Sequence, residues 1–454
     1  MKNKINFLLF LLILLVACNK KLDVLPQNTL TPDQIKSADD VKAVLFGGYF
    51  TMQNAASLGE KYNTLGELLI SNGDIDWAGT FAGYADIFEN SQLPTGNEIY
   101  QVWANSYHTI NTANIVLSKL DVLTGDEKTE IEGEAKFLRA ISYYYLVNFF
   151  ALPYSAGNTA ANPGVPLILA PVSGFEPGRD KLPRASVEAV YTQIVNDLKD
   201  GAAKMPEEMP DFRANKYSAT ALLSRVYLSQ LKYAEAAAAA DEVIESGFFS
   251  LTNTYEEAFN NNSNSSEDIF AIQQTSQSNS GTTNFGITTF YSGDPEGRGE
   301  IQITPSHLNM YEASDDRKAF FYDGSSISGD NGKLTGKWRE LYKAIPVLRL
   351  AEMYLTRAEA NFRKGGTATG RAPLEDVNEI RRRAGLANLG SIANADVIVK
   401  ERYIELAFEG ERLFTVRRLK LSVNGNPFDF PKLILPIPQR EIDLGNALPQ
   451  NPSY

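Results

Sequence analysis

The chain has very few residues of the two types that build most disulfides, metal centres and nucleophilic triads. Among its 454 residues there is one cysteine, Cys18, and there are two histidines, His108 and His307. A single thiol cannot close an intramolecular disulfide, so the fold must depend on its hydrophobic core, for which the chain is long enough. Two histidines argue against a histidine metal cluster and against a Ser-His-Asp triad. We therefore expect no metal site and no cofactor.

Long hydrophobic runs are also missing. The apolar stretch from Phe7 to Val16 has about half of the roughly 20 residues that a transmembrane helix needs. It follows the charged start Met1-Lys2-Asn3-Lys4 and leads directly to Ala17 and Cys18, which is the order of a lipoprotein export signal. We expect residues 1–17 to be removed, Cys18 to carry the lipid, and residues 18–30 to form a polar tether. An ordinary secretory signal with a chance cysteine is the alternative.

Basic residues are outnumbered by acidic ones. The chain has 43 Lys and Arg against 55 Asp and Glu, a net charge of -12 at pH 7. Because binding to phosphate backbones needs a basic stripe, nucleic acid is not an expected partner. Aromatic residues, in contrast, are plentiful, with 21 Tyr, 24 Phe and 3 Trp. Most of them should fill the core, but some could stack on sugar or peptide ligands.

Apolar residues recur with helical spacing over most of the chain. Three pairs of such segments predict antiparallel helix pairs, and glycines such as Gly247 and Gly385 follow several of them, as expected at helix ends. No change in composition divides the chain. We therefore predict a mostly α-helical fold, one compact body of tetratricopeptide-like helix pairs with long irregular loops and a few short strands. The paired segments are 103–120 with 131–145, 219–228 with 233–246, and 348–362 with 374–384.

Two long irregular regions interrupt the helical pattern. Residues 152–184 contain six prolines, and residues 260–299 are rich in Asn, Ser, Thr and Gly. Loops of this length in a compact domain are usually functional or disordered. A short strand is expected at Asp268–Ile272.

Charged residues near the C-terminus follow a helical spacing. Glu401, Glu405 and Glu409 are four residues apart, and Arg412 follows three residues later, which predicts one helix face. Two glutamates could be the acid and base of a glycosidase. Neighbouring arginines instead favour ion pairs with lowered carboxylate pKa values, in a buried network that braces the helices. Arg402, Arg417 and Arg418 lie close by in the sequence, and the same reasoning applies to Arg349, Glu352, Arg357 and Glu359.

Ten motifs in a defined order identify a family resemblance. They are Val102–Tyr107, Asn111–Asn114, Gly133–Ala140, Tyr143–Val147, Ile345–Leu355, Arg357–Ala360, Val377–Leu386, Glu401–Arg412, Leu435–Pro438 and Gln450–Tyr454. With these motifs the chain resembles the SusD/RagB outer-membrane nutrient-binding lipoproteins over essentially its whole mature length.

The resemblance implies a helical body anchored outside the outer membrane, with SusD-like parts at 31–215 and 216–454. Such a body lids a SusC-like TonB-dependent transporter and hands it oligosaccharides or, in some members, peptides. No catalysis is implied. After Cys18 the chain has Asn19-Lys20-Lys21 instead of an acidic cluster of the kind that favours surface display in some relatives. Display on the cell surface is therefore inferred from the family alone.

Sugar recognition needs flat rings and planar polar groups on loops held by a rigid scaffold. Residues 72–84 have both, with glycines around the rings, and by resemblance this segment and the loop 284–298 lie where family members take binding residues. An alternative is that the rings form a hydrophobic plug under the loop. The candidate ligand contacts are Asp74, Asp76, Trp77, Phe81, Tyr84, Tyr291 and Arg298, with Phe290 and Asp294 as weaker candidates.

The two other tryptophans, Trp103 and Trp338, are expected to pack in the structure, and His108 is expected on a helix face. The leading hypothesis is a non-enzymatic lipoprotein that binds an oligosaccharide and delivers it to the transporter. The alternatives are a peptide-binding member of the same family and a transporter scaffold that binds no nutrient. An enzyme would need a cleft with two unpaired carboxylates.

Overall fold

Helices are the main element of the chain. The computed structural model describes residues 32–174, 182–208, 213–444 and 448–454. The predicted signal at 1–17, the lipidation site Cys18 and the tether at 18–30 lie outside these residues. Within the described ranges, no helix is both long enough and apolar enough to cross a bilayer. The mostly α-helical fold predicted from periodicity is confirmed.

The longest helices come early in the chain. The C-terminal half of α6 is rich in Tyr and Phe and is buried on all sides, so this helix forms the centre of the core. The helices of this part are α2 (Ala38–Gln53), α3 (Lys61–Leu69), α4 (Ala82–Phe88), α5 (Asn97–Ser118), α6 (Gly125–Phe150), α7 (Val187–Lys204), α8 (Lys216–Ser229) and α9 (Tyr233–Glu245), with 3-10 turns η1 (Pro32–Gln34), η2 (Leu120–Val122) and η3 (Tyr154–Ala156).

Shorter helices and all strands but one follow α9. The helices are α10 (Ile287–Tyr291), α11 (Pro305–Leu308), α12 (Asp316–Ala319), α13 (Leu350–Lys364), α14 (Pro373–Arg383), α15 (Ala395–Glu405), α16 (Arg412–Arg418) and α17 (Gln439–Asp443), with 3-10 turns η5 (Glu256–Ala258), η6 (Gly336–Trp338) and η7 (Pro431–Leu433).

Two small antiparallel sheets lie among the helices. The first has the strand order β1-β3-β5-β4, and the second joins β2 to β6. The predicted strand at Asp268–Ile272 is β2. The strands are β1 (Ile75–Trp77), β2 (Asp268–Ile272), β3 (Ile301–Ile303), β4 (Phe321–Ser325), β5 (Asn331–Thr335) and β6 (Ile345–Arg349).

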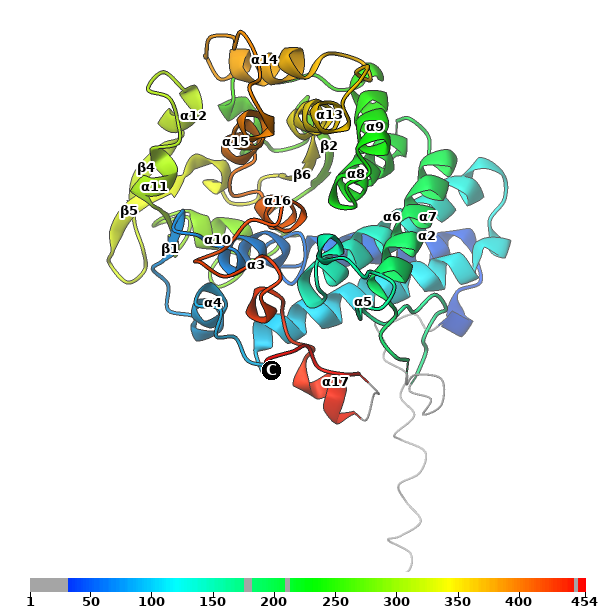
Figure 1. Cartoon of the computed structure of the whole chain (residues 1–454). Helices are drawn as coiled ribbons and strands as arrows, with labels where there is room; N and C mark the ends of the chain where they lie inside the picture. The colour runs from blue at the N-terminus through cyan, green and yellow to red at the C-terminus, as the bar shows by residue number, and fades with distance from the viewer. Residues whose placement is uncertain (1–31, 175–181, 209–212, 445–447) are drawn as a thin grey trace, which may run out of the picture.

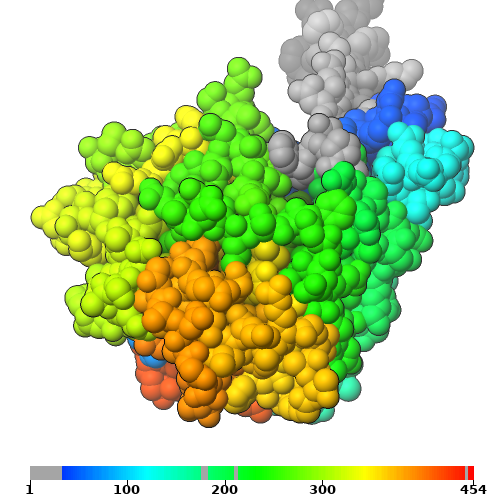
Figure 2. Space-filling model, turned by 90° about the horizontal axis from the view of Figure 1, so that it is seen from above, coloured from blue at the N-terminus to red at the C-terminus, as the bar shows by residue number. Residues whose placement is uncertain are grey.

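The predicted helix pairs are confirmed as α5 with α6, α8 with α9, and α13 with α14. Gly247 and Gly385 follow α9 and α14 with φ of 74° and 73°, a conformation that favours glycine. The pairs also pack on one another, because α6 contacts α7, α7 contacts α8, and α9 contacts α13. Figure 1 shows this succession from α5 to α14. In Figure 2 the orange residues of α14 and the green residues of the middle of the chain form one surface.

One hydrophobic cluster connects the two ends of the described chain, from Ile35 to Leu448. Trp103 and Trp338 are each 3% exposed and belong to it, as predicted, while His108 is exposed on α5. The indole N–H of Trp338 donates to the Phe408 carbonyl at 2.8 Å. The core therefore extends through both halves of the chain.

Gly59, between α2 and α3, lies where no side chain fits. A Cβ atom there would be 2.1 Å from the Gln53 carbonyl oxygen and 2.5 Å from the Ser280 Cβ. We expect Gly59→Ala to lower the free energy of unfolding by about 1–3 kcal/mol, because backbone must move to admit the methyl group. Urea denaturation measures this change.

Gly47 provides the matched control for Gly59. It lies within α2, and a Cβ atom there would meet nothing within 4 Å. Gly47→Ala should therefore stabilise the protein by up to about 1 kcal/mol, because alanine is the better helix former. Equal effects of the two substitutions would contradict the close packing at Gly59.

Candidate functional site

The predicted ligand segment, residues 72–84, folds as strand β1, a short loop and the start of α4. Strand β1 pairs antiparallel with β3, so that Trp77 lies opposite Ile301. The pairing continues in the loop, where the Ala78 N–H donates to the Glu300 carbonyl at 2.8 Å. The two regions that the sequence analysis selected, 72–84 and 284–298, therefore adjoin in the fold.

Four aromatic rings cluster where these regions meet. Trp77 stacks on Tyr84 with ring centroids 5.5 Å apart and planes at 8°, and it lies 6.3 Å from Phe290. The Phe81 ring is tilted against Tyr84 and against Phe290, with ring centroids 5.9 Å and 6.1 Å apart. Tyr84 and Phe290 are buried, whereas Trp77 and Phe81 are half-buried. The last two rings therefore offer apolar surface to a ligand.

Arg298 lies beside this surface. Its guanidinium is 4.7 Å from the centroid of the Phe81 ring. Nε donates to Glu300 Oε1 at 2.8 Å, and Nη2 donates to Thr80 Oγ1 at 2.7 Å. Burial raises the pKa of Glu300, although Arg298 acts to lower it. The two contacts hold the guanidinium in place, so it presents planar donors next to a ring.

Two buried polar atoms at this place lack a partner. Trp77 Nε1 and Glu300 Oε2 make no hydrogen bond with any residue in the described part of the chain. Both groups flank Gly79, where a Cβ atom would be 2.4 Å from the Trp77 ring and 2.8 Å from the Glu300 carboxyl carbon. Buried polar groups are normally hydrogen-bonded. Neither atom has exposed surface, so the two atoms are not ligand contacts in this structure.

The name Trp77 face is used below for Trp77, Thr80, Phe81, Arg298 and Glu300. Three of the predicted ligand contacts, Trp77, Phe81 and Arg298, belong to it. Asp76 is exposed on β1 opposite Gln302. The structure therefore brings only part of the predicted ligand site together.

Tyr84 and Tyr291, also predicted as ligand contacts, lie in the core. The Tyr84 side chain is 3% exposed, and its hydroxyl donates to Glu60. Tyr291 is 0% exposed, and its hydroxyl donates to Asn63 Oδ1 at 3.0 Å. Rings without exposed surface cannot stack on a ligand. In this structure Tyr84 supports Trp77 from below, and Tyr291 packs on the interior side.

Asp74, another predicted contact, is buried in an ion pair. Its carboxylate accepts from Arg412 and from the Tyr403 hydroxyl, the latter at 2.9 Å. The structure therefore places Asp74 in a structural role, where it joins β1 to the start of α16.

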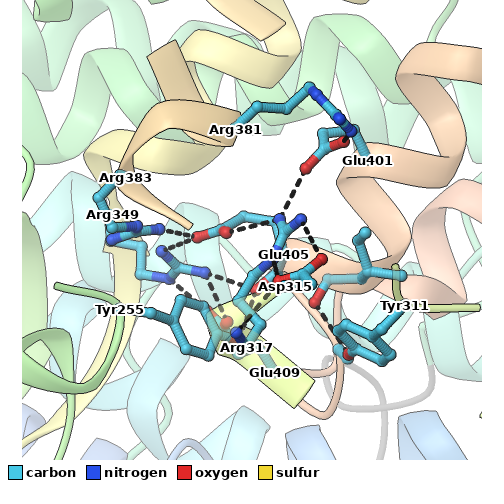
Figure 3. A network of polar contacts seen from close by, with 12 residues as sticks. Tyr255, Tyr311, Asp315, Arg317, Arg349, Arg381, Arg383, Glu401, Glu405 and Glu409 are labelled. Atoms are coloured by element: carbon cyan, nitrogen blue, oxygen red, sulfur yellow. Dashed lines mark hydrogen bonds and ion pairs between the residues drawn. The ribbon is translucent and has the colours of Figure 1, made fainter. Parts of the chain in front are cut away.

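The predicted ion-pair network is confirmed around Glu405 (Figure 3). This carboxylate is fully buried and binds Arg349 at 2.8 Å, Arg317 at 3.2 Å and Arg383. Burial alone would raise the pKa of Glu405, but the three arginines hold it well below the usual range. A carboxylate held ionised by three guanidiniums is not a proton donor for catalysis.

The prediction that Glu401, Glu405, Glu409 and Arg412 share one helix face was wrong. Helix α15 ends at Glu405, and the chain then turns through Phe408 and Gly410, which have φ of 63° and 75°. Glu409 nevertheless reaches the same network, because Arg349 Nη2 and Lys337 Nζ bind it at 2.8 Å and 2.5 Å. Arg412 begins α16 and pairs with Asp74 instead.

The second predicted group of charges also braces helices. Glu352 on α13 binds Arg225 on α8 at 2.6 Å and Arg402 on α15 at 3.3 Å. Glu359 is bound by Arg418 at 2.5 Å and 2.6 Å. No group of His, Cys, Asp or Glu within the described residues is arranged to hold a metal ion.

Sequence reasoning missed Glu300, Thr80 and Glu60. The alternation Ile301-Gln302-Ile303 is a signal for a strand at Glu300, but nothing local identifies β1 as its partner. Glu60 accepts both the Tyr84 hydroxyl and the Gly286 N–H, the latter at 3.0 Å. A contact between α3 and a loop more than two hundred residues later leaves no local pattern.

Two family models match this chain. One, described as "Starch-binding associating with outer membrane", matches residues 21–228, and the other, described as "SusD family", matches residues 330–427. Together they cover more than half of the chain.

Curated relatives extend the likeness to the full length. The chain is 27% identical to SusD-like protein P2 of Formosa agariphila over 531 aligned positions, which span 100% of both chains. It is 24% identical to the starch-binding protein SusD of Bacteroides thetaiotaomicron, over 80% of each chain.

Solved structures have the same fold. A SusD superfamily protein from Bacteroides vulgatus aligns with a TM-score of 0.83 and 24% identity, over 92% of this chain and 99% of the other. The surface glycan-binding protein A of Bacteroides fluxus aligns with a TM-score of 0.77 and 21% identity, over 92% and 100% of the two chains.

Proposed function

Because the chain belongs to the SusD/RagB family, we propose that it is a non-catalytic lipoprotein that binds an oligosaccharide on the Trp77 face. It then delivers this ligand to a SusC-like TonB-dependent transporter of the outer membrane. The lipid on Cys18 holds it at the cell surface. The observation that carries the proposal is the pair of half-buried rings next to a fixed guanidinium.

The chemistry of the Trp77 face suits a sugar. The apolar side of a pyranose ring can lie on Trp77 or Phe81, while its hydroxyls can accept from Arg298. Starch binding by a curated relative, at 24% identity, supports a glycan as the ligand class. The stacked Tyr84 and Phe290 beneath keep the exposed rings in position, so little ordering is needed on binding.

Removal of the central ring tests this proposal. In the protein spanning residues 19–454, we expect Trp77→Ala to weaken oligosaccharide binding at least about tenfold, because the stacking surface is lost. Calorimetry against a panel of plant, microbial and host oligosaccharides, with mixed peptides included, measures the affinity.

Phe50→Ala is the matched control for loss of an aromatic ring. Phe50 lies on α2, away from the Trp77 face, and is 63% exposed. Its removal should leave binding unchanged. Undiminished sugar binding by Trp77→Ala would place the site elsewhere. Binding of peptides alone would favour the peptide-binding alternative, and silence across the panel would favour a scaffold that binds no nutrient.

A further inference from the structure

A hollow of ≈ 440 Å³ lies along α5 and is also lined by Phe285. Its volume falls in the range of about 300–1,000 Å³ that is typical of ligand pockets. The residues that decide its chemistry are Asn54, Tyr100, Gln101, Asn105, His108 and Phe285. It is called the α5 hollow below.

The lining of the α5 hollow mixes apolar surface with several polar side chains. Among its described lining residues there is no Asp, Glu, Lys or Arg. Three side-chain amides, the Tyr100 hydroxyl and the His108 imidazole line the hollow together with the Phe285 ring. This composition matches a molecule with many hydroxyls and one apolar side, and it offers no partner to an ionised group.

Several of these polar groups are free to bind. The Gln101 amide and the Tyr100 hydroxyl make no hydrogen bond with any described residue. The Asn105 Nδ2 donates to the Thr51 carbonyl at 3.0 Å, which fixes the amide plane and leaves its oxygen available. Phe285 is 49% exposed, a large value for a phenylalanine.

The loop that carries Phe285 separates the α5 hollow from the Trp77 face and belongs to both. Asn284 Oδ1 lies 3.5 Å from Arg298 Nη1, and the next residue, Phe285, lines the hollow. The loop is held from below, because the Gly286 N–H donates to Glu60, which also accepts the Tyr84 hydroxyl. Consecutive residues of this loop therefore contact the Trp77 face and line the hollow.

We propose that the α5 hollow is a second carbohydrate subsite, which binds an uncharged sugar unit of the same glycan that the Trp77 face binds. The inference rests on the proposed function, since it names the length and charge of the ligand. Phe285 stacks against the sugar ring, and Gln101, Tyr100 and Asn105 bind its hydroxyls. The natural ligand is thus a chain of several units with a neutral sugar at this position.

The test uses the mature chain and neutral oligosaccharides of two to eight units from the malto-, cello-, xylo- and manno- series. In the wild type we expect affinity to rise with chain length until both sites are filled. In the double variant Gln101→Ala, Phe285→Ala the longer chains should lose about tenfold or more in affinity, while disaccharide binding at Trp77 stays unchanged. Calorimetry gives the affinities, and unchanged melting temperatures show that the variants fold.

Matched controls and the separate Trp77 variant distinguish the outcomes. Gln277→Ala and Phe50→Ala remove an exposed amide and an exposed ring outside the hollow, and they should change nothing. Equal loss of short and long chains in the double variant, or no loss, would overturn the subsite while the proposed function survives. If the double variant Gln101→Ala, Phe285→Ala loses sugar binding and Trp77→Ala retains it, the result would support the hollow and refute the Trp77 face. Absence of neutral sugar binding would overturn the subsite, and absence of binding to the whole oligosaccharide panel would overturn the proposed function too.

Discussion

Glu405→Gln lowers the free energy of unfolding by about 3–5 kcal/mol, the expected cost of breaking a buried ion pair from one side. The substitution leaves Arg317, Arg349 and Arg383 buried around a neutral amide. The new NH₂ group also turns donors toward guanidiniums that are donors themselves. Because those arginines come from α12, β6 and α14, the loss affects the junction of three separate segments.

Urea denaturation of the wild type and the variant measures this effect. Asp323→Asn is the matched control, because the Asp323 and Lys333 side chains are 87% and 38% exposed and their pair is worth about 0.5 kcal/mol or less. A cost for Glu405→Gln as small as that of the control would mean that water solvates the network.

The network itself shows how far charge patterning predicts structure. Glutamates with arginines beside them in the sequence correctly predict ion pairs, since such charges are buried only when paired. The partners Arg317 and Asp315 were not predicted, because they come from α12, whose sequence has no distinguishing pattern. The break after Glu405 was missed for a different reason. A spacing of four continues across it, although Gly410 takes a left-handed conformation there.

The residue types of the candidate site were predictable from the sequence, but the burial of each side chain was not. Glycines around Trp77 and Phe81 correctly suggest rings on irregular backbone, and both rings keep exposed surface. A glycine also lies beside Tyr84, but Tyr84 is on α4 and its hydroxyl donates to Glu60, so its ring is buried. Burial depends on which distant element covers a residue, and the pairing of β1 with β3 is set by tertiary contacts. Glu300 enters the site only through that pairing.

The stability of this protein should depend on pH with two opposed limbs. Glu359 is buried, which alone would raise its pKa, but Arg418 lowers it to about 2. The unfolded value is about 4.3, so the carboxylate contributes stability above that pH, and the contribution is lost as pH falls toward 2. The shift corresponds to about 3 kcal/mol. Glu359→Gln should remove the part of the acid limb that Glu359 contributes, at a cost in stability at neutral pH, while Glu405 keeps its own lowered pKa.

Glu67 contributes to the opposite limb, as do Glu134 and Asp268, because burial raises the pKa of each to about 7. In Glu67, burial raises the pKa against the lowering effect of Arg412 and of the Gly410 N–H. Its folded pKa exceeds the unfolded one, so stability is full below about pH 4.3 and falls as pH rises through 7, by on the order of 3 kcal/mol. Glu67→Gln imitates the protonated acid and should flatten the curve between pH 5 and 8. Urea midpoints at pH 3, 5 and 8 separate the limbs, since the wild type should be most stable near pH 5, and a steady rise in stability to pH 8 would refute the role of Glu67.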